Sequence, residues 1–339
     1  MPVDKLKPND PRVQSLTANV RGKTYKYILA KPEGTQRGTA LLVHGFPDLG
    51  FGWRNQVPLL TSMGLQVIVP DMLGYGGTDA PQELALYSIK SVCDDLAELV
   101  RQVIGNDETI VLGGHDWGGA VVWRFALWHP EMLKAVFSVC TPYVGPAPQF
   151  YEYEDMVKVL PNFRYQIQLA SPDVEREIGS DPDKIRGLLS GMYGGLGPEG
   201  ERVFTTDHGV HFDQLSRMGK SPLLDEEEIE FYVSQYARNG MRGPVNWYRT
   251  RKINFEEERV LLKDGEQPTI KAPSLMIVST GDVALPPRMA DAMDKHFVSL
   301  KKTTVDGTHW ALWDATEKVN ADIGQFVEGV LNGTVKASI

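Results

Sequence analysis

The sequence predicts an α/β fold, in which a mostly parallel sheet is flanked by helices and a helical lid is inserted into the chain. Short, continuously apolar segments such as 39–43 (TALLV) and 109–112 (TIVL) alternate with amphipathic segments. This alternation is typical of a parallel sheet that helices cover on both faces. Over 141–254 it gives way to helical patterns and Gly/Pro clusters. We therefore expect an α/β core formed by 1–140 and 255–339, with 141–254 as the helical lid.

Strands are predicted where β-branched and aliphatic runs are bounded by turn residues such as Gly45 and Pro70. Helices are predicted where apolar residues recur at helical spacing, as Ile89, Val92 and Leu96 do. In chain order, the predicted strands are 25–30, 39–43, 65–69, 109–112, 135–139, 274–279 and 300–305. The predicted helices are 88–104, 118–128, 225–238, 286–297 and 317–331.

The composition is that of an ordinary globular protein, and 339 residues are enough for roughly two domains. The 35 Lys and Arg residues against 44 Asp and Glu give a net charge of −9, which argues against a uniformly basic nucleic-acid-binding surface. Cys93 and Cys140 are too few for a disulfide framework. The N-terminus is unlike a secretory signal, and no uninterrupted apolar run reaches about 18 residues. We expect a cytoplasmic monomer or weak homo-oligomer that binds neither nucleic acid nor a membrane.

A glycine-rich turn with an aspartate at its centre is the most informative motif. The segment Gly113–Gly119 (GGHDWGG) follows a predicted strand and opens a predicted helix. Glycines two residues before and two after Asp116 let the neighbouring backbone approach closely around a sharp turn. An aspartate is ionised at neutral pH and needs no base to become a nucleophile. Asp116 is therefore a candidate nucleophile; the alternative is a carboxylate that only caps the helix.

A second motif, 44–48 (HGFPD), directly follows the predicted strand 39–43. A His-Gly segment in this place commonly contributes one backbone N–H to an oxyanion hole, and the residue after the nucleophile contributes the other. These N–H groups are those of Phe46 and Trp117. The alternative is a plain turn that ends the strand.

The order nucleophile, acid, histidine is completed further along the chain. Asp282 follows the predicted strand 274–279, and His309 follows the predicted strand 300–305. A histidine in such a loop can act as a base, and a buried aspartate would hold its tautomer. The rival acid position, directly after 135–139, holds no carboxylate, which favours Asp282.

No metal or cofactor site is expected. The segment 74–78 (GYGGT) lacks the Gly-Lys-Ser/Thr ending of a phosphate loop and the glycine spacing of a dinucleotide site. His208 and His211 have the spacing of a metal-binding pair, but without Cys or HExxH context exposed loop histidines are the better interpretation.

With these motifs in this order, the chain resembles the α/β-hydrolase fold and, within it, the epoxide hydrolases of the soluble type. The resemblance extends from about residue 20 to 330 and rests on the segments 44–47 and 114–119 together with Asp282 and 309–310. The family also uses two tyrosines from the helical lid, and the matching positions are Tyr165 and Tyr248. One departure is Thr308, where a glycine is frequent.

The resemblance implies a mechanism for a small-molecule epoxide and water. Asp116 would attack an epoxide carbon while Tyr165 and Tyr248 donate hydrogen bonds and a proton to the ring oxygen. His309, oriented by Asp282, would then deprotonate a water that hydrolyses the resulting ester to a vicinal diol. Since the base must be neutral, activity is expected to fall on the acid side of about pH 6.

The N–H groups of Phe46 and Trp117 would hold the oxyanion of that ester hydrolysis, and Phe46, Trp117 and Trp310 are expected to line the substrate pocket. The main alternative is a haloalkane or haloacid dehalogenase with the same Asp116. Phe46 argues against it, because many dehalogenases have an Asn at that position. A non-catalytic binding protein of the same fold is the alternative from another class. A serine esterase is disfavoured, because no Ser occupies the nucleophile turn.

Overall fold

The computed structural model describes residues 3–335, which form two compact units. The α/β unit comprises the chain up to Met72, Ile89–Pro148 and the chain from Asn254 onward. The helical unit comprises Leu73–Ser88 and Gln149–Ile253. Within the described part of the chain, no helix is both long and apolar enough to span a bilayer.

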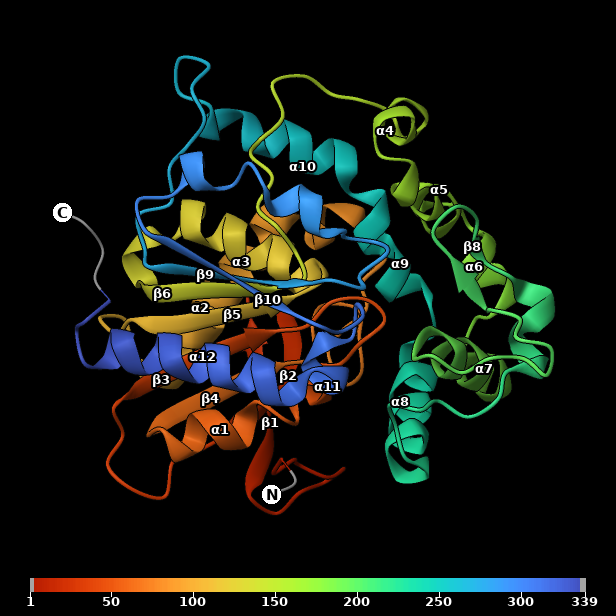
Figure 1. The fold of residues 1–339 in the computed structure, drawn as a ribbon, viewed down its shortest axis with the longest axis horizontal. Helices are drawn as coiled ribbons and strands as arrows, with labels where there is room; N and C mark the ends of the chain where they lie inside the picture. Colours follow the sequence, from red (N-terminus) through yellow and green to blue (C-terminus); the bar gives the residue numbers. More distant parts are fainter. Residues whose placement is uncertain (1–2, 336–339) are drawn as a thin grey trace. The chain divides into compact units, whose positions relative to one another are not determined.

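The α/β unit is built on one eight-stranded sheet with the strand order β1-β2-β4-β3-β5-β6-β9-β10 (Figure 1). The β1–β2 and β2–β4 pairs are antiparallel, and the other pairs are parallel. The strands are β1 (Val13–Val20), β2 (Lys23–Ala30), β3 (Gly38–Val43), β4 (Leu65–Pro70), β5 (Ile110–His115), β6 (Leu133–Val139), β9 (Ser274–Ser279) and β10 (Leu300–Val305). All residues of β4, β5 and β9 are buried, which confirms the predicted sheet.

Strand β1 is absent from the sequence prediction. Its sequence, VQSLTANV, is half polar, and only its last residue is buried. It reaches β2 through a tight turn at Arg21 and Gly22, whose φ angles are +49° and +81°. An edge strand that faces solvent lacks the apolar run by which the central strands were identified.

Helices cover both faces of the sheet, with α2 (Ile89–Ile104) and α3 (Trp117–Trp128) on one face and α1 (Val57–Ser62) and α12 (Thr316–Leu331) on the other (Figure 1). The other helices of the α/β unit are α10 (Arg251–Glu258), whose residues 251–253 belong to the helical unit, α11 (Ala311–Asp314), and the 3₁₀ turns η1 (Gly50–Trp53), η3 (Pro130–Met132), η6 (Arg259–Leu261), η7 (Pro287–Ala290) and η8 (Asp294–His296).

The predicted helix over 286–297 is wrong, because only η7 and η8 form there. Pro286 is extended, with ψ of 150°, as expected for a residue that precedes another proline.

The helical unit contains α4 (Tyr153–Val159), α5 (Tyr165–Ala170), α6 (Asp173–Glu177), α7 (Pro182–Met192), α8 (Glu226–Asn239), α9 (Arg242–Arg249), the 3₁₀ turns η2 (Leu84–Tyr87), η4 (Pro161–Phe163) and η5 (Phe212–Arg217), and the hairpin β7 (Phe204–Thr205) and β8 (Gly209–Val210). Helix α8 begins at the predicted place, because Asp225 and Glu228 form a capping box.

The segment 73–88, assigned to the α/β core from the sequence, belongs to this unit. The indole N–H of Trp247 donates to the carbonyl of Leu73, at 3.0 Å.

Candidate active site

Asp116 lies at the sharp turn between β5 and α3. Its φ of +53° and ψ of −124° are unusual for a residue other than glycine, and its side chain makes no capping hydrogen bond to α3. The positions two before and two after Asp116 must be glycines, because a side chain at either one would clash with the neighbouring backbone. A Cβ on Gly114 would lie 2.3 Å from the carbonyl oxygen of Gly118, and one on Gly118 would lie 2.0 Å from that of Val43. The turn therefore holds the Asp116 carboxylate for a role other than capping.

The loop after β3 meets this carboxylate. The backbone N–H of Phe46 donates to Asp116 Oδ1 at 2.6 Å. A Cβ on Gly45 would lie 2.2 Å from the same oxygen and 2.5 Å from the backbone nitrogen of Trp117. The two expected oxyanion donors thus belong to segments in close contact, and the absence of a side chain at Gly45 makes that contact possible.

His309 lies between two carboxylates. Its Nδ1 donates to Asp282 Oδ2 at 2.7 Å, and its Nε2 lies 3.5 Å from Asp116 Oδ2. The other Asp282 oxygen accepts the backbone N–H groups of Ala284, at 2.9 Å, and Leu285, at 2.8 Å. The hydrogen bond from Nδ1 to Asp282 fixes the orientation of the imidazole ring, and in this orientation Nε2 faces Asp116.

The loops after β9 and β10 are tied together beneath this pair. Gly281 N donates to Gly307 O at 2.8 Å, and Ser279 Oγ donates to Thr308 O at 2.7 Å. Since β9 and β10 are parallel neighbours, their carboxyl ends meet at one edge of the sheet, and this brings Asp282 beside His309.

The ionisation of this pair follows from its charges. Burial alone would lower the pKa of His309, but the negative charges of Asp282 and Asp116 and the hydrogen bonds to them raise it well above its ordinary value. Burial would likewise raise the pKa of Asp282, and the charge and hydrogen bond of His309 bring it below the usual value. The free protein therefore favours a cationic His309 paired with an anionic Asp282.

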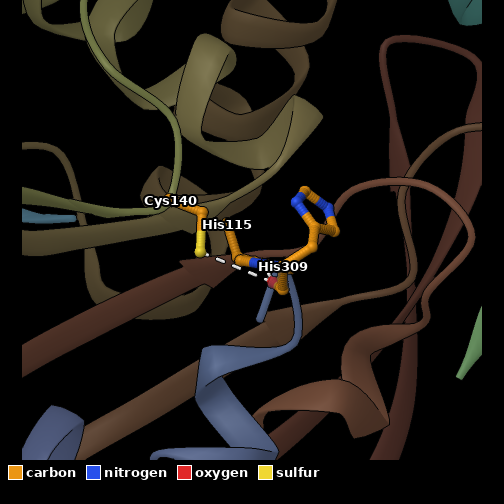
Figure 2. A group of neighbouring side chains, drawn as sticks. All are labelled: His115, Cys140 and His309. Carbon is orange, nitrogen blue, oxygen red and sulfur yellow. Dashed lines mark hydrogen bonds between the residues drawn. The ribbon is translucent and has the colours of Figure 1, made fainter. Parts of the chain in front are cut away.

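His115, Cys140 and His309 form a cluster of metal-ligand types, with their ligand atoms within 4.8 Å of one another. Figure 2 shows that His115 and Cys140 reach the main-chain oxygen of His309, while the His309 ring points away from them. His115 Nε2 donates to that oxygen at 2.7 Å and Cys140 Sγ at 3.4 Å. Burial lowers the pKa of His115 to about 4 and raises the pKa of Cys140 well above its usual value, so the thiol keeps its proton. This cluster supports the backbone of His309 and offers no thiolate to a metal.

The other histidine pair is also a poor metal site. The rings of His208 and His211 stack with centroids 4.5 Å apart and planes 15° apart. A metal ion lies in the plane of each imidazole that binds it, and two stacked, nearly parallel planes do not converge on one ion.

The two tyrosines are neighbours within the helical unit. Tyr165 opens α5 and Tyr248 lies in α9, and their ring centroids are 6.2 Å apart at an interplanar angle of 74°. Both side chains are buried, and the Tyr153 hydroxyl donates to the carbonyl of Tyr248.

The expected pocket aromatics differ in how much surface they offer. Phe46 and Trp310 are buried, with exposed fractions of 4% and 6%, whereas Trp117 is half-buried. The Trp310 ring packs edge-on against His309, with centroids 5.3 Å apart, and stacks on Trp313 at 4.7 Å. Trp310 therefore packs against the His309 ring and supports it.

Sequence reasoning missed two supporting residues. From the sequence, Cys140 was considered as one of two cysteines too few for a disulfide framework, and Thr141 was assigned no role. Thr141 Oγ1 donates to the carbonyl of Asp116 at 2.8 Å. Their place directly after β6, one strand from β5, is the signal that could have identified them.

Comparison with known proteins shows the family to which the chain belongs. The alpha/beta hydrolase fold family model matches residues 40–173. "Epoxide hydrolase srdG" of Neurospora crassa is 41% identical over 98% of this chain and 100% of that protein. "Bifunctional epoxide hydrolase 2" of Sus scrofa is 30% identical over 94% of this chain, which spans 58% of that protein's length.

Among solved structures, Epoxide Hydrolase A from Mycobacterium thermoresistibile superposes with a TM-score of 0.78. It is 27% identical, over 96% of this chain and 100% of that one. The chain therefore belongs to the epoxide hydrolases of the α/β-hydrolase fold.

Proposed function

We propose that this protein hydrolyses epoxides to vicinal diols through a covalent ester of Asp116. The observation that carries the proposal is the Asp116 carboxylate at the turn after β5, with the Phe46 N–H on one oxygen and His309 facing the other. The names of the relatives, as epoxide hydrolases, support the same substrate class. The partners are a small-molecule epoxide and water.

In the first step Asp116 attacks an epoxide carbon in line with the carbon–oxygen bond that breaks. The oxygen that leaves takes a proton from Tyr165 or Tyr248, because an alkoxide is a poor leaving group in an apolar pocket. Their side-by-side placement on α5 and α9 is consistent with two donors to a single oxygen. We propose that the inserted helical segment acts as a lid that supplies these donors.

In the second step His309 deprotonates a water that attacks the ester carbonyl of Asp116. Formation of the ester removes one of the two negative charges that raise the pKa of His309, so the imidazolium loses its proton more readily and becomes a base. The N–H groups of Phe46 and Trp117 would hold the oxyanion, a role worth about 3 kcal/mol per donor. Nucleophile, acid and base are all side chains of this protein, so the reaction calls for no cofactor.

A single turnover in oxygen-18 water tests the covalent route. With enzyme in excess over styrene oxide, the diol of the first turnover should take its new oxygen from Asp116 and stay unlabelled. Label that enters this first diol directly would rule out the ester. Halide release from a haloalkane, with epoxides left untouched, would instead indicate the dehalogenase.

The role of His309 can be tested in the same assay. His309→Gln should accumulate the ester, which intact-protein mass spectrometry detects as a gain of one substrate mass. His296→Gln is the matched control, because His296 lies in η8 and contacts neither carboxylate. If His309→Gln turned over as fast as the control, His309 would not be the base.

A further inference from the structure

The small β7–β8 hairpin packs against the start of α5, the helix that Tyr165 opens (Figure 1). The N-cap residue, Arg164, makes no side-chain cap hydrogen bond. Instead, the backbone N–H of Tyr165 donates to the carbonyl of Thr206, in the hairpin turn, at 3.0 Å. The Tyr165 ring meets the Phe204 ring edge-on, with centroids 5.2 Å apart. The hairpin therefore caps this helix at the residue that carries the phenol.

Gln168 makes the second attachment, one helical turn further along. Its Oε1 accepts the backbone N–H of Val210 at 2.6 Å, and its Nε2 donates to the Val210 carbonyl at 2.9 Å. The side-chain amide thus pairs with β8 as a neighbouring strand would. Gly209 makes room for it, because a Cβ there would lie 2.3 Å from Gln168 Oε1 and the φ of Gly209 is +105°.

Neither partner of this contact is stable by itself. Helix α5 has six residues, and each strand of the hairpin has two, all far below the length at which isolated helices or hairpins persist in water. Residues 165 and 168 lie on the same face of α5, since a spacing of three residues is close to one turn. The attachment through Gln168 therefore sets the orientation of that face.

We propose that Gln168 is a positioning residue, which orients Tyr165 for proton donation by fixing α5 to the β7–β8 hairpin. This inference rests on the proposed role of Tyr165 in epoxide opening. It predicts a selective defect. Ester formation needs the tyrosine acid, whereas hydrolysis of the ester depends on His309 and Asp282. Loss of the Gln168 attachment should therefore slow the first step and spare the second.

Gln168→Leu tests the proposal, with Gln235→Leu on α8 as a matched control and Tyr165→Phe as the reference. Rapid-quench single turnovers with styrene oxide, read by intact-protein mass spectrometry, give the rates of ester formation and ester hydrolysis separately. For Gln168→Leu we expect ester formation to slow about 10- to 100-fold, in the range that a misplacement of about 1 Å produces. Ester hydrolysis should stay within about twofold, as should both rates in Gln235→Leu.

Gln168→Glu keeps the acceptor for the Val210 N–H but loses the donor to its carbonyl, and should give a smaller defect in the same step. The inference is wrong if Tyr165→Phe slows ester formation while both Gln168 variants leave it unchanged. It is equally wrong if the two steps slow together, because that is the result of a merely structural role. If Tyr165→Phe itself has no effect, the proposed acid fails instead, and with it the basis of this inference.

Discussion

Gly45 shows how a missing side chain shapes the site. A Cβ at this position would lie 2.2 Å from Asp116 Oδ1 and 2.5 Å from the nitrogen of Trp117, so an alanine must displace either the carboxylate or the loop that carries the Phe46 N–H. Gly45→Ala should therefore reduce epoxide turnover by about 100-fold or more, because misplacement of about 1 Å costs that much. Steady-state assays and a thermal melt separate loss of activity from loss of fold.

Gly34→Ala is the matched control, because a Cβ at Gly34 meets nothing within 4 Å. It should match the parent in both measurements. Full activity in Gly45→Ala would show that this close contact does not constrain the nucleophile.

The charge of His309 also couples the site to stability. The pKa of His309 is raised in the folded protein, so protonated His309 adds to the free energy of unfolding. This contribution is fully present below the pKa of the unfolded chain, about 6.5, and is lost as pH rises through the pKa of the folded protein. The parent should therefore have a higher free energy of unfolding in urea than His309→Gln at pH 6, and this difference should shrink between pH 6 and pH 9. An advantage that grows over this range would contradict the ion pair.

Part of the site could be predicted residue by residue. Asp116, Asp282 and His309 each follow a strand at its carboxyl end, and parallel strands bring those ends to one edge. Tyr165 and Tyr248 came only from the family resemblance, because no local pattern separates them from the other ten of the 12 tyrosines. The contact of Gln168 with Val210 could not be foreseen, since two-residue strands leave no periodic signal.

Among the elements, the central strands and the helices α2, α3, α8 and α12 were predicted because burial on one or both faces gives them a hydrophobic pattern. Strand β1 was not predicted. The β1–β2 hairpin that contains it is held in place by ion pairs as well as by strand pairing. The carboxylate of Asp95, on α2, is fully buried. It accepts hydrogen bonds from Arg21 Nη1 at 2.9 Å and the Tyr25 hydroxyl at 2.8 Å, and lies 3.0 Å from Lys23 Nζ. The β1–β2 hairpin is thereby fixed to α2.

Asp95→Ala should destabilise the protein by about 3–5 kcal/mol, the usual cost of removing one partner from a buried ion pair, because the Lys23 cation stays buried without its counter-charge. The measurement is the urea midpoint, followed by far-UV circular dichroism. Glu98→Ala, on the exposed side of the same helix, is the control and should unfold near the parent's midpoint. Equal midpoints for the two variants would mean that the hairpin does not depend on this carboxylate.

For the whole molecule, the chain enters the helical unit twice, once for 73–88 and once for 149–253. Hydrophobic periodicity shows where the long insertion lies, but the short segment has no such pattern, and its place depends on tertiary contacts. Gly74 and Gly243 are in backbone contact, since a Cβ on Gly74 would lie 2.7 Å from the carbonyl carbon of Gly243. Each of the two units is therefore assembled from segments that are distant in sequence.

Asn239 is the residue at which this assembly can be tested. At the end of α8, its side-chain amide donates to the carbonyls of Gly76 at 3.2 Å and Thr78 at 3.1 Å. Asn239→Ala removes both bonds, each worth about 1 kcal/mol, so the turn at 74–79 should open more often and its amides should exchange about 30-fold faster. Hydrogen-exchange mass spectrometry resolves this turn from β5, whose buried amides should keep the parent's rate. Asn332→Ala, beyond α12, is the control. If exchange at 74–79 matched the parent, the remaining contacts of the segment, such as the edge-on packing of Tyr75 against Tyr236, would be enough to hold it in the helical unit, and Asn239 would be dispensable.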